Sequence, residues 1–138
     1  MEDFVTYDIA KKLKEKGFKE KCFAYYDPKG CDLYTIQTPF RGGDFEDCMY
    51  SYNSLRKECR FVECIDAPTI SQVLKWLREE KKLFVEPSLF KYGYESYVQS
   101  AIFEKDKDYT DTWRVEGFHS TYEQAAIAGI EYVLDNLI

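Results

Sequence analysis

The segment 67–82, APTISQVLKWLREEKK, constrains the fold more than any other. Thr69 and Gln72 have the spacing of a capping box, in which the hydroxyl caps a free backbone N–H and the amide reaches back. Pro68 disfavours helical backbone at the residue before it, so the helix begins after the proline. Apolar side chains then follow helical spacing: Ile70, Val73, Leu74, Trp76 and Leu77. A helix with one apolar stripe must pack against another element, and aromatic strand-like segments flank it.

A second amphipathic helix is expected at the end of the chain. The segment STYEQ, which begins at Ser120, contains two overlapping capping boxes. The predicted inner stripe is Ala126, Ile130, Val133, Leu134 and Leu137. Ala125 and Gly129 are small residues on a neighbouring line, where a sheet or another helix could approach closely.

A short helix is expected near the N-terminus. Thr6 is a suitable N-cap and Gly17 a suitable residue after the C-cap, so the pair brackets a helix over residues 7–16. Phe18 follows the glycine, where an apolar side chain folds back on the last helical turn.

Strands are expected in the rest of the chain. The turn Asp27-Pro28-Lys29-Gly30 joins strands 21–26 and 31–38, and a bulge at its glycine would place Tyr25 opposite Leu33. Further segments are a loop at 39–47, an uncertain hairpin of 48–52 with 60–65, a strand at 83–86, a turn at 87–90, and strands 92–104 and 112–118 around a loop. In the last strand, Trp113 alternates with Arg114.

These elements predict an α+β fold with one two-layer domain over residues 1–138. Its twisted antiparallel sheet would contain both hairpins and one or two shorter strands. The central and C-terminal helices would pack on one face of that sheet, because each has a single apolar stripe. The hydrophobic content of 45% is enough for a core.

The chain is expected to be cytoplasmic. Its first residues, MEDFVTYDIAKK, lack the basic and apolar regions of a secretory signal, and no apolar segment approaches ~18 residues. The cysteines, without such a signal, indicate reduced thiols: Cys22, Cys31, Cys48, Cys59 and Cys64.

No catalytic, cofactor or metal site is predicted. His119, the single histidine, could pair with any cysteine, so a cysteine-dependent enzyme is retained as an alternative, although no local feature marks an activated thiol. The cysteines lack the two close pairs of a structural zinc site. The acidic residues around the last loop depart from the spacing of a calcium-binding loop: Glu104, Asp106, Asp108 and Asp111.

The net charge of −6 is unevenly distributed. The segment from Lys11 to Lys21 contains six lysines and two glutamates and is therefore about +4, which leaves −10 for the remainder. A nucleic-acid-binding accessory protein that uses this segment is a further alternative. The acidic remainder disfavours it, and a solvated helix face is the simpler explanation.

The leading hypothesis is a small non-enzymatic binding or adaptor protein. The sequence shows no catalytic motif, and its 12 Tyr and 10 Phe could leave an aromatic patch for binding. The candidate interaction surface is Tyr92, Tyr94, Tyr97, Ala125, Gly129 and Tyr132. One expected partner is a second copy of the chain, which would form a homodimer through the last helix or the edge of strand 92–104. The other is an unknown protein. Alternatively, Ala125 and Gly129 only let the helix lie close to its own sheet.

Three segments together resemble a known group of proteins: APTISQVLKWLREE, GYESYVQSAIFEKD and STYEQAAIAGIEYVLDNLI. In this order they are similar to small uncharacterised proteins of gut Bacteroides genomes, often found in prophage or mobile-element gene blocks. The resemblance covers residues 67–138. It implies a cytosolic bacterial or phage accessory protein of α+β fold, and it implies no activity and no catalytic residues.

Overall fold

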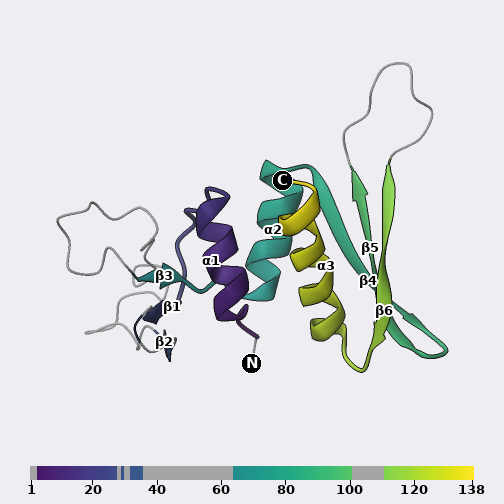
Figure 1. The fold of residues 1–138 in the computed structure, drawn as a ribbon, viewed down its shortest axis with the longest axis horizontal. Coiled ribbons are helices and arrows are strands. Elements are labelled where there is room, and N and C mark those ends of the chain that lie inside the picture. The colour runs from purple at the N-terminus through teal and green to yellow at the C-terminus, as the bar shows by residue number, and fades with distance from the viewer. Residues whose placement is uncertain (1–2, 28, 30–31, 36–63, 101–110) are drawn as a thin grey trace, which may run out of the picture. The chain divides into compact units, whose positions relative to one another are not determined.

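The computed structural model describes residues 3–27, 29, 32–35, 64–100 and 111–138 (Figure 1). In these residues, three helices and two three-stranded antiparallel sheets confirm the predicted α+β class. The elements are α1 (Tyr7–Glu15), β1 (Ala24–Asp27), β2 (Asp32–Thr35), β3 (Ile65–Asp66), α2 (Ile70–Glu80), β4 (Leu83–Phe90), β5 (Gly93–Ser100), β6 (Thr112–His119) and α3 (Tyr122–Asn136). No helix in the described parts of the chain is long and apolar enough to cross a membrane.

The chain divides into two compact units, Phe4–Thr69 and Met1–Asp3 with Ile70–Ile138. The two predicted hairpins belong to different sheets, with strand orders β2-β1-β3 and β4-β5-β6. The prediction of one sheet that contains both hairpins is therefore wrong. Each sheet has its own helical partner, so neither hairpin needs the other to cover its apolar side.

In the first unit, α1 has both predicted ends. Thr6 accepts a hydrogen bond from the Ile9 amide at 3.4 Å, and the helix ends at Lys16 as C-cap. Gly17 then adopts φ +88°, and the Phe18 amide donates back to the Leu13 carbonyl at 3.0 Å. Phe18 is fully buried, which confirms that it folds back on the last turn.

The first hairpin has a register that differs from the prediction. Tyr25 lies opposite Tyr34, and Leu33 lies opposite Tyr26. The last pair is Asp27 with Asp32, so four residues connect the strands instead of the three that a bulge requires. The Asp27 carboxylate accepts a hydrogen bond from the Lys29 amide at 2.9 Å and thereby stabilises the start of this connection.

β3 completes the first sheet by pairing with the other side of β1. Ile65, expected in a hairpin with residues 48–52, lies opposite Tyr26. Residues 48–52 and 60–63 are outside the described part of the chain. Tyr26 is buried, and its hydroxyl donates a hydrogen bond to the Val5 carbonyl at 2.6 Å.

In the second unit, α2 and α3 lie on one face of the β4-β5-β6 sheet, as predicted (Figure 1). α3 packs across all three strands, and α2 packs against β4 and α3. The predicted stripe of α2 is buried in full: Ile70, Val73, Leu74, Trp76 and Leu77. The Ile70 amide donates to the Asp3 carbonyl at 3.0 Å, so the preceding chain satisfies a free N–H of the first turn.

β4 is twice as long as predicted. It continues through Pro87 to Phe90, where a turn was expected, and the hairpin turn is instead Lys91–Tyr92. Pro87 cannot donate a hydrogen bond, but β4 is an edge strand of its sheet. An edge strand has one unpaired side, so it tolerates the missing donor.

α3 begins at the second of the two predicted caps. Thr121 accepts a hydrogen bond from the Gln124 amide at 3.2 Å. Ala125 and Gly129 are buried beside the predicted stripe, and the Ser96 hydroxyl of β5 donates to the Ala125 carbonyl. A Cβ at position 129 would overlap Cγ1 of Val85 and lie 3.1 Å from Cβ of Ser96. The small residues therefore let the helix lie close to its own sheet.

Substitutions at Gly17 and Lys82 are expected to change stability in opposite directions. Lys82 follows α2 with φ +56°, a left-handed conformation that is unfavourable for a residue with a Cβ. Lys82→Gly should raise the free energy of unfolding by about 0.5–1 kcal/mol. Gly17→Ala should lower it by about 1 kcal/mol. No atom lies within 4 Å of a Cβ at position 17, so the loss would be purely conformational. Urea denaturation would measure both, and two shifts of the same sign would contradict this explanation.

Candidate interaction surface

β5 presents alternate side chains to the two faces of its sheet. Ser96 donates a hydrogen bond to Ala125 of α3, and Val98 is fully buried, so both lie on the side of the helices. Glu95 and Tyr97 therefore point to the opposite side. We call this side, which no described helix covers, the outer face.

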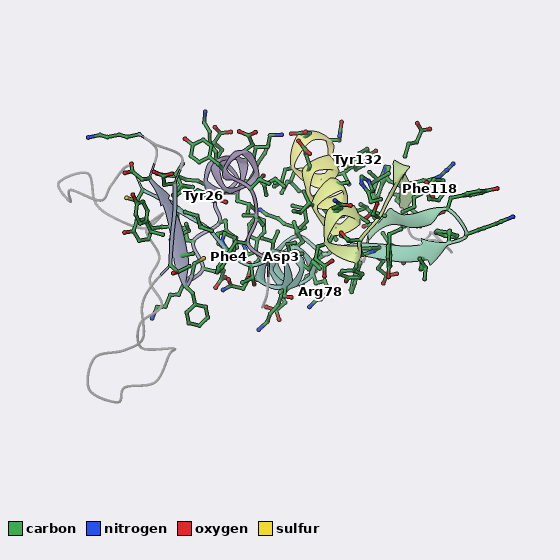
Figure 2. All side chains as sticks on the ribbon, turned by 90° about the horizontal axis from the view of Figure 1, so that it is seen from below. Asp3, Phe4, Tyr26, Arg78, Phe118 and Tyr132 are labelled. Atoms are coloured by element: carbon green, nitrogen blue, oxygen red, sulfur yellow. The ribbon has the colours of Figure 1, made fainter. Side chains whose placement is uncertain are left out.

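Four aromatic residues form a continuous group on the outer face and its hairpin turn. The ring centroids of Phe90 and Tyr97 are 6.1 Å apart, those of Phe90 and Phe118 are 6.5 Å apart, and those of Tyr92 and Phe118 are 5.9 Å apart. Phe90, Tyr92 and Phe118 are 43%, 74% and 45% exposed. Figure 2 labels Phe118 on β6. We call these four residues the outer aromatic cluster.

An ion pair between a buried glutamate and an exposed arginine lies beside the outer aromatic cluster. Arg114 donates from Nε to Oε1 and from Nη2 to Oε2 of Glu95, both at 2.9 Å. The Tyr97 hydroxyl donates to the same Oε1 at 3.1 Å. The Glu95 side chain is 3% exposed, whereas that of Arg114 is 56% exposed. The bidentate ion pair and the bond from Tyr97 thus fix the orientation of Arg114 and Tyr97 at the surface.

The ion pair changes the titration of its members. The hydrogen bonds from Arg114 lower the pKa of Glu95, against the effect of desolvation, and the bond from Tyr97 lowers it further. The hydrogen bond to Glu95 also raises the pKa of Tyr97. The Glu95 carboxylate is therefore ionised at neutral pH although its side chain is buried.

Acid is expected to weaken the fold through Glu95. Because the folded-state pKa of Glu95 is lowered, its stabilising effect is complete above the unfolded pKa of about 4.3 and is lost as the pH falls through the folded value. The urea midpoint of wild type should therefore exceed that of Glu95→Gln at pH 7, and the difference should shrink in acid. A difference that is constant from about pH 7 to pH 3 would contradict this role.

Two glycines shape the strand ends that carry the cluster. Gly117, next to Phe118, has φ +114° at a register shift between β5 and β6, a backbone conformation that favours glycine. Gly93 has φ +126°, and a Cβ there would lie 2.7 Å from the carbonyl oxygen of His119. His119, the histidine considered for catalysis, lies half-buried at the end of β6, with its backbone packed against Gly93.

The structure does not bring all the predicted surface residues together. Tyr92 and Tyr97 belong to the outer aromatic cluster, but Tyr94 contacts Tyr122 of α3 at 6.3 Å between ring centroids. Tyr132 is half-buried on α3 (Figure 2), and Ala125 and Gly129 are buried. β5 is the central strand, so the prediction that its edge is free for pairing is wrong.

The described cysteines do not favour the enzyme alternative. Cys22 is fully buried, and burial, followed by the nearby carboxylates of Asp66 and Glu20, raises the pKa of its thiol. A thiol in such an environment is a poor nucleophile. Cys64 is half-buried, and the other three cysteines lie outside the described residues.

The described residues contain no group of three or more His, Cys, Asp or Glu side chains that could hold a metal ion. Of the acidic residues considered for calcium, only Asp111 is described.

The lysine-rich segment is partly used by α1. Lys12 and Lys14 lie in the last turn of the helix, where positive charge complements the helix dipole, and both are half-buried. Lys11, Lys19 and Lys21 are exposed. This arrangement fits a solvated helix face, and nucleic-acid binding stays an untested alternative.

The outer aromatic cluster is the largest group of exposed rings in contact with one another among the described residues. Such a group on one face of a sheet is typical of surfaces that bind other molecules. No protein-family model, curated protein or solved structure matches this chain.

Proposed function

We propose that this protein is a non-enzymatic binding protein that uses the outer face of the β4-β5-β6 sheet to bind a protein partner. The observation that carries the proposal is the outer aromatic cluster. Three of its rings are 43–74% exposed although they contact one another. Aromatic side chains supply most of the binding energy at many protein interfaces.

The ion pair supports this proposal in a second way. Glu95 holds Arg114 and Tyr97 through three hydrogen bonds, so these surface side chains are ordered before any partner arrives. Ordering side chains in advance lowers the entropy cost of binding. The guanidinium retains donors that face solvent, because Glu95 uses only Nε and Nη2.

The test is selection of peptides from a random library on the immobilised full chain, followed by fluorescence anisotropy with each selected peptide. Phe118→Ala should weaken binding by about tenfold, as truncation of an aromatic anchor does. Tyr34→Ala is the matched control, because Tyr34 on β2 is an aromatic residue with the same 45% exposure. Its affinity should equal that of wild type.

Two results would refute the proposal. One is a selected peptide whose affinity is unchanged by both Phe118→Ala and Tyr92→Ala. The other is the failure to select any peptide that binds the folded chain. Circular dichroism of each variant separates loss of binding from loss of fold.

The cellular setting that we propose comes from the sequence. The resemblance of residues 67–138 to proteins of Bacteroides mobile elements supports a cytoplasmic accessory protein, and we extend the proposal to that setting. A second copy of the chain is the other proposed partner. Sedimentation velocity up to about millimolar protein would reveal such a dimer, and a monomer at all concentrations would exclude it.

A further inference from the structure

The outer face carries more carboxylates than the ion pair needs. Glu86 of β4 lies directly opposite Tyr97, which in turn lies opposite Arg114 of β6, so the three form one row across the sheet. The hydrogen bond to Glu95 is the main cause of the raised pKa of Arg114, and Glu116 lies near enough to contribute to it. Glu86 and Glu116 are both exposed.

The charge that remains on this face is negative. Glu95 and Arg114 are bonded to each other and cancel. Glu86 and Glu116 make no ion pair with any described residue. Lys91, in the hairpin turn, places a positive charge beside Tyr92. The whole chain has a net charge of −6, so the long-range field agrees in sign with the local one.

One ring of the cluster already faces a cation. Nζ of Lys91 lies 5.7 Å from the centroid of the Tyr92 ring, within the range of a cation–π interaction. Tyr92 is 74% exposed, and its ring also contacts Phe118. The cluster therefore offers aromatic faces that attract ammonium and guanidinium groups, beside carboxylates that complement their charge.

We infer that the partner of the outer face is a basic peptide segment, in which lysine or arginine side chains alternate with apolar ones. This inference rests on the proposed function and specifies the chemistry of its partner. The apolar side chains cover Phe90 and Phe118. The cationic ends lie over the aromatic rings and next to Glu86 and Glu116, which supply the complementary charge.

The test compares three capped heptapeptides of one sequence, with a central phenylalanine flanked by two lysines, two acetyl-lysines or two glutamates. Changes in the backbone amide chemical shifts of the protein during titration with each peptide would report both the affinity and the place where the peptide binds. The lysine peptide should bind about five- to tenfold more tightly than the acetyl-lysine peptide, because each exposed cation–π contact contributes about a factor of two to five. The glutamate peptide should bind most weakly.

Variants of the protein test which residues cause the preference for the lysine peptide. Glu86→Gln with Glu116→Gln should reduce the preference for the lysine peptide, because it removes the complementary charge and keeps the rings, and it should leave the affinity for the acetyl-lysine peptide unchanged. Glu79→Gln is the matched control, because Glu79 is an exposed glutamate on α2. Lys91→Ala should strengthen binding of the lysine peptide, since it removes the competing cation at Tyr92.

The outcomes separate this inference from the proposed function. Equal affinity of all three peptides for the outer face would overturn the inference and leave the proposed function intact. The same holds for a preference for the glutamate peptide. Failure of every peptide to perturb the amides of β4, β5 and β6 at millimolar concentration would count against both. Concentration-dependent shifts of these amides without peptide would identify a second copy as the occupant and overturn the inference.

Discussion

Leu77→Ala is expected to lower the free energy of unfolding by about 2–5 kcal/mol. Leu77 is fully buried on α2, and its removal leaves a cavity in the core that α2 shares with β4 and α3. The cost combines lost burial of the methyl groups with the cavity that the neighbours do not refill. Urea denaturation monitored by circular dichroism would measure it.

Lys75→Ala is the control for this substitution. Lys75 lies on the exposed side of the same helix, and alanine is a good helix former, so the urea midpoint should change little. A Leu77→Ala midpoint equal to that of Lys75→Ala would contradict the assignment of the stripe to the core.

Gly129→Leu is expected to destabilise the protein by about 3 kcal/mol or more, although leucine is the better helix former. The first atom of a side chain at this position already overlaps Cγ1 of Val85 and crowds Ser96. The helix must then move away from the sheet, which also strains the hydrogen bond from Ser96 to Ala125. Thermal and urea denaturation would both report the loss.

A double-mutant cycle isolates the cause. Gly129→Ala and Val85→Ala should each destabilise the protein, and the double variant should lose less than the sum, because the second change removes the atom that the first one meets. Additive losses would show that the close approach to Val85 is not the reason. The same geometry makes Gly129→Leu unsuitable as a test of dimerisation, since it alters the core of the monomer.

The helices were predictable because their signals are local. Capping residues act on amides two or three positions away, and the apolar stripes repeat every turn. Thr121 and the turn from Gly17 to Phe18 therefore appear in the structure as the sequence indicated. Leu137, expected in the inner stripe of α3, is half-buried, since it lies beyond the last helical turn.

Strand pairing was harder because it depends on residues far apart in the chain. Pro87 indicates a turn by its local preference, and only the position of β4 at the sheet edge makes it acceptable in a strand. The register of the first hairpin depends on how many residues the turn uses, and a shift of one residue changes every pair. The separation of the strands into two sheets has no local signal at all.

The candidate surface could be predicted only in part. Counting along a strand over residues 92–104 places Tyr92 and Tyr97 on opposite faces, but Tyr92 lies in the hairpin turn, where the alternation of a strand does not apply. Phe118 joins them because it lies on the same face of β6 as Arg114, as the alternation of a strand requires. The alternation of Arg114 with Trp113 was visible in the sequence, whereas the pairing of Arg114 with Glu95 requires the register of β5 and β6.

Adjacent residues of β5 are anchored in opposite directions. Glu95 is held by Arg114 on the outer face, and Ser96 is held by the Ala125 carbonyl of α3 on the other. A single peptide bond therefore separates the solvent-facing charge network from the backbone of the helix. Restraint of the network by a bound molecule, or its release by protonation, would reach α3 through this bond. Hydrogen exchange at the first turns of α3 would then respond to events on a surface that the helix never touches.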